Sequence, residues 1–407
     1  MTERTTAATG EGSAVRPPKQ EQLEASDEIV EVAPSILRLQ LPIDFTGLGH
    51  VNTYALEDAD GFALVDPGLP GEKSWRILLS RLEAANIPLN RVHTVLVTHS
   101  HPDHFGGAGL LAEESGARIV ASEFFRTWWD PDDLDDRELE TADISRAGDP
   151  SRTSLPGGTT SAASLAHAVV APHDHAAHDA AEDDDPSAPR VLALPPSPFG
   201  RPTPWGGKTE ELPPERRKEL EANLSDAMRW FRVPRPTHRL ADADHITLAG
   251  REWVALFTPG HTNDHLCLFD PEEGVLLAGD HVLPTITPHI SGMIAGDPLA
   301  RYVESLDRIA SFDGVRNVLP AHGNPFANLA GRVNEIKEHH EGRLERLREI
   351  SEEAGWASVK DLSHRLFSEK AWGSMAESET YAHLEHLRMK GDASTREDVG
   401  ILQYLCS

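Results

Sequence analysis

Short apolar runs rich in β-branched residues recur along the chain, and each one ends at a polar loop. Residues 93–98 form the first such run, and similar runs cover residues 253–258, 274–278 and 316–319. Runs of this length, bounded by glycine, proline and polar residues, are typical of buried strands. We therefore predict four strands, each followed by a loop that a rigid scaffold would hold in place.

The apolar pattern changes to a helical spacing towards the end of the chain. Ile336, Leu344, Leu347 and Ile350 recur at intervals that place them on one face of a helix. Ser358 is suited to cap a second helix. Residues 380–389 predict a third helix, and residues 399–404 predict a closing strand. Three helices and a terminal hairpin predict a winged-helix-like domain over residues 332–407.

Two other stretches carry too little apolar surface to offset the entropy lost on ordering. Residues 130–210 contain acidic runs, a tract rich in Ser, Gly and Ala, and a Pro-rich segment. His173, His175 and His178 lie in this stretch, and we interpret them as part of a solvated low-complexity insert rather than a metal site. The predicted organisation is a disordered tail over residues 1–29, a catalytic domain over residues 30–331 with a largely disordered insert, and the C-terminal domain.

Metal-type ligands follow directly after the four predicted strands. They are His99, His101, Asp103, His104, His261, Asp280 and His322. Side chains two positions apart point to the same side of an extended segment, so His99 and His101 can reach one cation together. The turn that begins at Pro102 can direct Asp103 and His104 to a second cation. We expect the four strand ends to converge on one edge of a sheet.

The ligand chemistry narrows the choice of metal. Imidazole and carboxylate ligands without a thiolate suit Zn²⁺ and also tolerate Mn²⁺ or Fe²⁺. Each short motif taken singly is more often an ordinary polar turn than a site. The block from His99 to His104 is the exception, because three His and one Asp within six residues after an apolar strand rarely arise as a satisfied turn.

In the order and spacing of these ligands, the chain resembles the metallo-beta-lactamase-fold hydrolase superfamily. The resemblance rests on T-H-x-H-x-D-H at residues 98–104, T-P-G-H-T at residues 258–262, G-D at residues 279–280 and P-x-H-G at residues 320–323. Residues 47–54 and 63–68 look like the first hairpin and the following Asp-x-Gly turn of that fold. Residues 279–288 are similar to bacterial members of the beta-lactamase-like protein 2 branch, which is related to glyoxalase II and carries a C-terminal winged helix.

The resemblance implies an αββα sandwich and a role for each ligand. His99, His101 and His261 match the ligands of a first metal, and Asp103, His104 and His322 match those of a second. Asp280 matches the carboxylate that bridges them. Two Zn²⁺ ions about 3.5–4 Å apart would then hold the hydroxide that attacks the substrate. Asp103 matches a residue that also orients this hydroxide, so it is the predicted catalytic residue.

Departures from other relatives argue against two activities, antibiotic hydrolysis and flavin-linked di-iron chemistry. Beta-lactamases of this fold usually place a Cys among the ligands of the second metal, but no motif of this chain contains Cys. Flavin-linked di-iron relatives replace the second His of the first block with a carboxylate, whereas this chain keeps His101. Of the other nearby histidines, we interpret His50 and His265 as outer hydrogen-bond partners, and His281 and His289 as the better candidates for substrate contact.

Composition adds bounds on partners and location. The net charge of −28 disfavours nucleic-acid phosphates as partners, although much of the acidity lies in the predicted insert. Only two cysteines are present, the N-terminus has no signal-peptide pattern, and no run of about 18 apolar residues occurs. We therefore expect a cytoplasmic protein without a membrane segment.

The predicted function is metal-dependent hydrolysis of an ester or thioester bond in a small molecule. The first alternative is metal-dependent cleavage of RNA phosphodiesters, and the second is a metal-sensing regulator that binds DNA through the C-terminal domain. Acidic residues in the predicted third helix make DNA the least favoured partner and packing or homodimerisation the favoured role of that domain. The ligands define the nucleophile, whereas the loops of the pocket define the substrate, so the substrate class and the leaving-group acid stay open.

Overall fold

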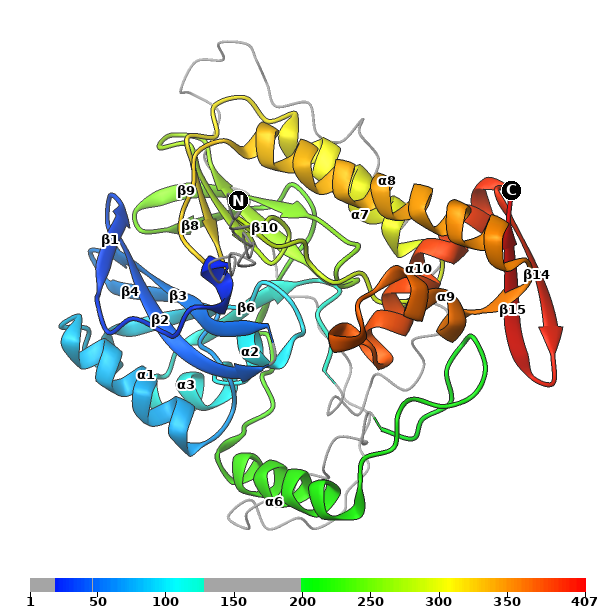
Figure 1. Ribbon diagram of the computed structural model, residues 1–407. Coiled ribbons are helices and arrows are strands. Elements are labelled where there is room, and N and C mark those ends of the chain that lie inside the picture. The colour runs from blue at the N-terminus through cyan, green and yellow to red at the C-terminus, as the bar shows by residue number, and fades with distance from the viewer. Residues whose placement is uncertain (1–18, 46, 128–198) are drawn as a thin grey trace, which may run out of the picture.

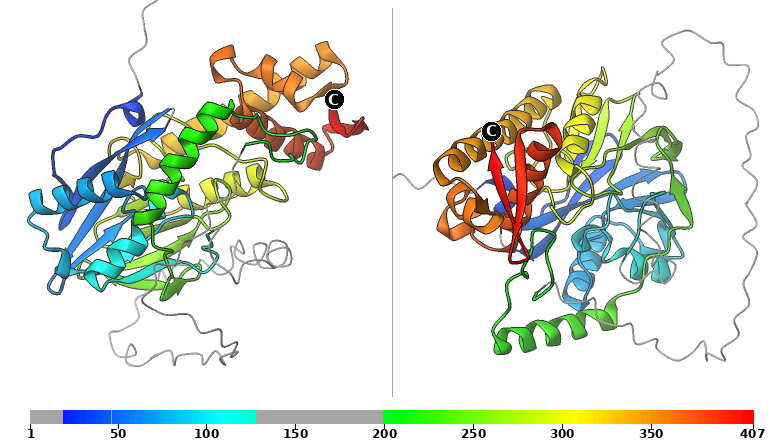
Figure 2. Two further views of the ribbon diagram at one scale, coloured as in Figure 1. Left: turned by 90° about the horizontal axis from the view of Figure 1, so that it is seen from below. Right: turned by 90° about the vertical axis from the view of Figure 1, so that its right-hand side faces the viewer.

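The computed structural model describes residues 19–45, 47–127 and 199–407. Within them, two β-sheets lie face to face, and helices cover the outer face of each sheet (Figures 1 and 2). This arrangement confirms the predicted αββα sandwich. Residues 1–18 of the predicted tail and residues 130–198 of the predicted insert lie outside the described residues.

The first sheet contains seven strands, which pair in chain order. They are β1 (Val30–Ala33), β2 (Ile36–Phe45), β3 (Leu48–Asp58), β4 (Gly61–Val65), β5 (Val92–Leu96), β6 (Arg118–Ser122) and β7 (His238–Leu240). The strands from β1 to β4 pair antiparallel, and those from β4 to β7 pair parallel. Helices α1 (Glu72–Ala84) and α3 (Ala108–Ser115) provide the crossovers that parallel neighbours require. Helix α6 (Pro214–Trp230) precedes β7.

The second sheet contains five strands in the order β12-β11-β10-β9-β8. They are β8 (His245–Leu248), β9 (Arg251–Phe257), β10 (Leu266–Asp270), β11 (Val275–Gly279) and β12 (Asn317–Pro320). Only the β11–β12 pair is parallel, and helix α7 (Pro298–Ala310) connects its two strands.

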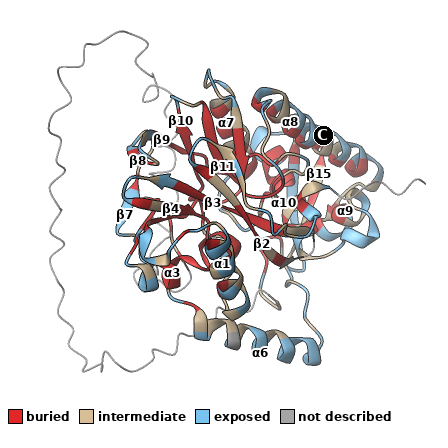
Figure 3. Ribbon diagram, turned by 90° about the vertical axis from the view of Figure 1, so that its left-hand side faces the viewer, coloured by how far each residue is buried: buried red, intermediate tan, exposed pale blue. Residues whose placement is uncertain are grey.

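Alternating side chains of each strand build the layers, because successive residues of a strand point to opposite faces. In β9, Trp253 and Ala255 belong to the apolar cluster between the two sheets, whereas Val254 and Leu256 pack in the outer cluster that includes residues of α7. Because both faces of each sheet are covered, the central strands of both sheets are almost entirely buried (Figure 3). Such double burial explains why the runs in the sequence are continuous rather than alternating.

The four predicted ligand strands correspond to β5, β9, β11 and β12, so their existence is confirmed. Their expected convergence on the edge of one sheet is wrong in one respect, because β5 belongs to the first sheet and the other three belong to the second. The two sheets meet at this edge through a hydrogen bond from the Leu266 N–H to the Thr98 carbonyl, 2.9 Å long. The ligands therefore gather at the shared edge of a sandwich.

The C-terminal part contains three helices and a three-stranded sheet. The elements are α8 (Leu329–Ala354), β13 (Ala357–Ser358), α9 (Val359–Leu366), η5 (Glu369–Ala371), α10 (Ser374–Lys390), β14 (Ala393–Asp398) and β15 (Ile401–Cys406). The side chain of Ser358 accepts a hydrogen bond from the Asp361 N–H and so caps α9. Three helices with a closing hairpin were predicted here, and the assignment of this part to the winged-helix class stays a prediction.

The structure differs from the sequence prediction at the ends of two supposedly disordered segments. Residues 19–29 of the predicted tail include a short helix η1 (Gln20–Gln22), in which the Glu21 side chain is fully buried. Residues 199–210 of the predicted insert contain a bridge between Pro202 and Lys208, and Trp205 is buried beside the C-terminal helices. Single large or charged side chains with specific partners hold these segments, and composition averaged over a window hides them.

None of the helices that the described residues form is both long and apolar enough to cross a membrane.

Candidate metal centre

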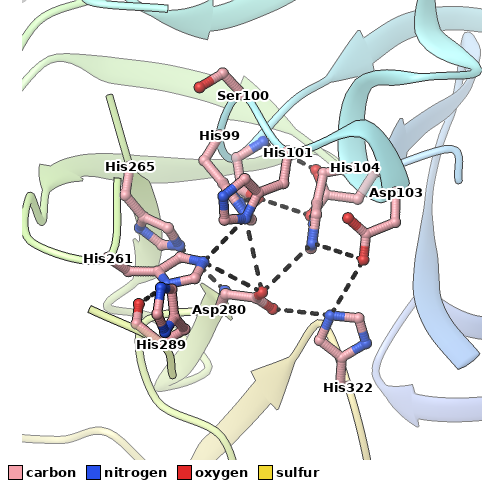
Figure 4. A network of polar contacts seen from close by, with 12 residues as sticks. His99, Ser100, His101, Asp103, His104, His261, His265, Asp280, His289 and His322 are labelled. Carbon is pink, nitrogen blue, oxygen red and sulfur yellow. Dashed lines mark hydrogen bonds and ion pairs between the residues drawn. The ribbon is translucent and has the colours of Figure 1, made fainter. Parts of the chain in front are cut away.

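Local chain geometry presents the first block of ligands on two sides of one short turn. Strand β5 ends at Leu96, and the extended segment after it carries His99 and His101. Pro102 then starts the short helix α2 (Pro102–Phe105), where its missing N–H costs nothing. Asp103 and His104 follow on this helical turn, so they leave the chain in a different direction from His99 and His101 (Figure 4).

The other three ligands come from the ends of β9, β11 and β12. Gly260 precedes His261 with a φ of 135°, a conformation that side-chain-bearing residues rarely adopt. Asp280 directly follows the last residue of β11. The loop with His322 is held to β11 by a 2.8 Å hydrogen bond from the Ala321 N–H to the Gly279 carbonyl. The backbone conformation and pairing at the strand ends therefore position these three ligands.

The seven predicted ligands gather in two groups that share one carboxylate. In the first group, His101 Nδ1 lies 3.0 Å from His99 Nε2 and 3.1 Å from His261 Nε2. In the second group, Oδ2 of Asp103 lies 3.5 Å from His104 Nε2 and 3.6 Å from His322 Nε2. The ligand atoms within each group lie no more than 4.8 Å apart, and Asp280 belongs to the first.

Asp280 faces both groups. Its Oδ2 lies 3.5 Å from His261 Nε2 in the first group and 3.6 Å from His104 Nε2 in the second. Its Oδ1 lies 3.1 Å from His322 Nε2 (Figure 4). This is the position that the sequence resemblance implied for the bridging carboxylate.

Neighbouring groups hold the second ring nitrogen of three ligands. His261 Nδ1 lies 2.8 Å from the His289 carbonyl, and His322 Nδ1 lies 2.6 Å from the His50 carbonyl. His104 Nδ1 lies 2.9 Å from Oδ2 of Asp66. An N–H at each Nδ1 leaves the lone pair of Nε2 directed into the site, which is how proteins orient metal-binding histidines.

Several polar atoms of this centre are buried without a hydrogen-bond partner among the described residues. They are Nε2 of His104 and the pair Nε2 of His322 and Oδ1 of Asp280, which lie 3.1 Å apart but do not form a hydrogen bond. An unsatisfied buried polar atom costs about 1–3 kcal/mol, so a cluster of them requires an explanation. A divalent cation fits, because all three atoms offer lone pairs and the donor set of imidazoles and carboxylates is suited to such ions.

The electrostatics of the two groups differ. Burial lowers the pKa of His99 and of His101 well below the ordinary value, which keeps both rings neutral. Burial also opposes protonation of His104, but the carboxylates of Asp103 and Asp280 outweigh it and raise the pKa of His104 well above the ordinary value. The second group therefore favours a positive charge, which a bound cation supplies as well as a proton does.

The two predicted substrate-contact residues behave differently. His281 is fully buried between the rings of Tyr302 and His265, with centroids 5.1 and 5.7 Å away. The side chain of His289 keeps 23% of its surface exposed and lies beside the first group (Figure 4). For both residues, contact with substrate stays a prediction.

Some residues that orient the ligands were not predicted from the sequence. Asp66 was interpreted only as part of a turn, yet its carboxylate accepts hydrogen bonds from both the N–H and the hydroxyl of Thr98, at 2.9 and 2.8 Å, besides contacting His104. The signal was present, because an acidic residue after an apolar strand stands at the same sheet edge as the ligands. His265 behaves as expected of an outer partner, since its Nε2 accepts from the Asp280 N–H at 3.1 Å.

Comparison with known families agrees with this site. The model of the metallo-beta-lactamase superfamily matches residues 46–322, which is more than half of the chain and includes all seven ligands. The chain belongs to the metallo-beta-lactamase superfamily. Its clusters of histidine and aspartate are suited to binding divalent metal ions.

Relatives of known sequence cover only part of the chain. A Lactamase-like protein nscB of Arthroderma benhamiae is 43% identical over 89 residues, which is 22% of this chain and 19% of that protein. A Lactamase-like protein nscB of Trichophyton verrucosum is 42% identical over 122 residues, which is 30% of this chain and 40% of that protein. The matched segments thus span well under half the length of these relatives.

Solved structures extend the likeness to most of the chain. A metallo-beta-lactamase family protein from Thermus thermophilus aligns with a TM-score of 0.63 and 25% identity, over 93% of this chain and 100% of the other. A beta-lactamase domain protein from Burkholderia ambifaria aligns with a TM-score of 0.65 and 24% identity, over 95% and 96%. The second likeness concerns the fold alone.

Proposed function

We propose that this chain is a binuclear metal-dependent hydrolase that cleaves an ester or thioester bond of a small molecule. The observation that carries the proposal is the position of Asp280, with one carboxylate directed at both ligand groups. Two bound divalent ions, most simply Zn²⁺, would supply a hydroxide at neutral pH and polarise the oxygen of the scissile bond.

The residues of the chain have separate tasks in this reaction. The three histidines of the first group and the Asp103–His104–His322 group would each hold one ion. Asp103 is the proposed catalytic residue, because its carboxylate lies between the two histidines of the second group, where it can orient the attacking oxygen. Burial of Asp103 and Asp280 to about 5% and 6% exposure limits competing water.

Charge is one ground for the choice of substrate class. The chain has a net charge of −28, much of it in the predicted insert, and an acidic chain repels polyanions, so we propose a small ester or thioester rather than RNA. Helix α10, the third helix of the C-terminal part, also argues against a DNA-binding regulator. Most residues from Thr380 to Leu387 are buried against neighbouring elements, so this stretch of the helix has no free face to enter a DNA groove.

A proposed cytoplasmic setting agrees with the cysteines. Cys267 and Cys406 are both free and buried, which is common where thiols stay reduced.

An activity screen of the metal-reconstituted protein tests the proposal. The panel would include esters, acyl thioesters, lactones, phosphodiesters and a labelled RNA. We expect turnover of thioesters or esters that Asp103→Ala and His104→Ala abolish. Asp60→Ala and His238→Ala alter exposed residues of the same types and should leave turnover unchanged.

The outcome that would overturn the proposal is specific. Cutting of RNA that the same two variants abolish, with thioesters and esters untouched, would replace it with the phosphodiesterase alternative. Metal content that neither variant lowers would remove the two-metal site itself.

A further inference from the structure

A third group of potential metal ligands occurs in the described residues, away from the centre that the family resemblance implies. It consists of His340 on α8 and of Glu379 and His383 on α10. Glu379 and His383 are four positions apart on one helix, so their side chains share a face. The ligand atoms of the three residues lie within 4.8 Å of one another.

We propose that His340, Glu379 and His383 form a third metal site, which binds a Zn²⁺-type divalent ion between helices α8 and α10. The donor set contains two imidazoles and one carboxylate, which is a set that proteins use for Zn²⁺ and for Fe²⁺. Nothing in the motifs of the metallo-beta-lactamase superfamily includes these residues, which lie beyond the matched segment.

The spacing of the two imidazoles matches that of the metal centre. His340 Nδ1 lies 3.1 Å from His383 Nε2. The corresponding nitrogen pairs of the first ligand group, His99 with His101 and His101 with His261, are 3.0 and 3.1 Å apart. Two nitrogens bound to one tetrahedral Zn²⁺ at about 2.0–2.1 Å are separated by a similar distance.

The orientation of His383 also follows the pattern of the metal centre. Its Nδ1 lies 2.7 Å from the backbone carbonyl of Glu379, to which an N–H at this position donates. The lone pair of Nε2 is thereby directed at His340. The ligands His261 and His322 are held by backbone carbonyls in the same way, and outer partners of this kind commonly orient ligating histidines.

The environment keeps all three groups in the protonation state that a metal requires. His340 and His383 are 1% and 0% exposed, and burial lowers the pKa of His340 to about 2 and that of His383 to about 4. Burial opposes ionisation of Glu379, but its contacts with His289 and Arg343 outweigh this and lower the pKa of Glu379 to about 2. Two neutral imidazoles and a carboxylate are therefore present at neutral pH.

One neighbour distinguishes this site from the metal centre. Arg343 forms an ion pair with Glu379, and its positive charge repels a bound cation. We therefore expect the third ion to bind more weakly than the ions of the centre. A chelator added in increasing amounts should remove it first.

Occupancy would join the C-terminal helices to the metal centre. Oε2 of Glu379 lies 3.4 Å from His289 Nδ1, and the carbonyl of His289 lies 2.8 Å from Nδ1 of the ligand His261. An ion that fixes Glu379 would thus fix α10 against the loop that orients His261. The role we assign to the third ion is structural.

Metal analysis of the full-length protein, equilibrated with Zn²⁺ and freed of loosely bound ion, tests this site. We expect three ions per chain in the wild type and two in His383→Ala and in His340→Ala. His386→Ala is the matched control, because His386 lies one turn further along α10 and pairs with Asp297 instead. It should keep three ions. Asp103→Ala should lose ions of the centre while the third ion remains.

A second measurement distinguishes loss of the third ion from a general loss of folding. Glu379→Gln keeps the size of the side chain and still accepts from His289, so it should fold, yet it should lose the third ion at a lower chelator concentration than the wild type. Zn²⁺ beyond two equivalents should raise the unfolding temperature of the wild type and not that of His383→Ala.

Two results would overturn the third site. One is a wild-type content of two ions that His383→Ala and His340→Ala leave unchanged, which would leave the two-metal centre standing. The other is a third ion that Glu379→Gln and both histidine variants retain, which would place it elsewhere.

Discussion

Oδ2 of Asp66 lies 2.9 Å from Nδ1 of His104, although the two residues are 38 positions apart in the chain. Asp66 directly follows β4 with a φ of 53°, and it is 1% exposed. The same carboxylate accepts from both polar groups of Thr98, next to the first ligand. One buried acid at a sheet edge therefore orients the segment that carries four of the seven ligands.

Replacing this acid should weaken metal binding without touching a ligand. We expect Asp66→Asn to lower the affinity for the second metal about 10- to 100-fold, because the single amide oxygen of Asn cannot replace both carboxylate oxygens that accept from His104 and from Thr98. Asn suits the test, since it tolerates a positive φ better than most residues. Competition with a chromophoric chelator measures the change. An affinity equal to that of the wild type would show that Asp66 has no role in orienting His104.

Gly260 provides a test of how the backbone positions His261. A Cβ added at Gly260 would lie 2.4 Å from Cβ of Tyr302 on α7, so Gly260→Ala should displace the loop and weaken binding of the first metal. Gly314→Ala is the control, because its φ of 90° is similarly unfavourable for a side chain but nothing lies within 4 Å. Both variants should lose about 1–2 kcal/mol of stability from backbone strain. Metal titration should separate them, and equal metal affinity in both would contradict the steric argument.

Glu21 connects the N-terminal segment to the loop that follows Asp280. Its buried side chain accepts from the Thr285 and Ile286 N–H groups, at 2.6 and 3.1 Å. Glu21→Ala leaves both donors without their partner, so we expect the free energy of unfolding to fall by about 2–4 kcal/mol in urea denaturation. Glu24→Ala removes an exposed acid three residues later and should change it by about 0.5 kcal/mol or less. Equal losses in the two variants would show that Glu21 is not a structural anchor.

His383 should make the stability of the protein sensitive to acid. Burial lowers the pKa of His383 from 6.5 to about 4. The unfolded chain therefore binds this proton more readily, so the contribution of His383 to stability is complete above pH 6.5 and is lost as the pH falls from 6.5 to 4. A shift of this size corresponds to about 3 kcal/mol.

Unfolding measured at several pH values, with a chelator present so that only protonation matters, checks this expectation. His383→Asn should show a smaller loss of stability between pH 6.5 and 4 than the wild type. His238→Asn, which changes an exposed histidine of β7, should follow the wild-type curve. Identical pH dependence of His383→Asn and the wild type would rule out His383 as the source.

The metal ligands and the residues that support them differ in how far the sequence could predict them. The ligands from His99 to His104 could be predicted from the sequence, because they all lie within six residues and follow a strand pattern. The partners of Asp66 and Glu21 could not be predicted from the sequence, because each acts on a residue that is distant in the chain: 38 positions for Asp66 and His104, and 264 for Glu21 and Thr285. For His281, nearness to Asp280 in the chain suggested substrate contact, and the structure buries this residue completely, so the contact stays a prediction.

By itself, the sequence predicted the four ligand-bearing strands and the seven candidate ligands, because local apolar periodicity and short ligand spacing are properties of neighbouring residues, whereas the sandwich class followed from the resemblance of its motifs to a known family. Only the tertiary structure decided that the ligands arise from two sheets and that His340 of α8 meets Glu379 and His383 of α10. These are contacts between side chains far apart in the chain. Strand pairing and helix packing set them, and no local pattern records which distant residues will meet.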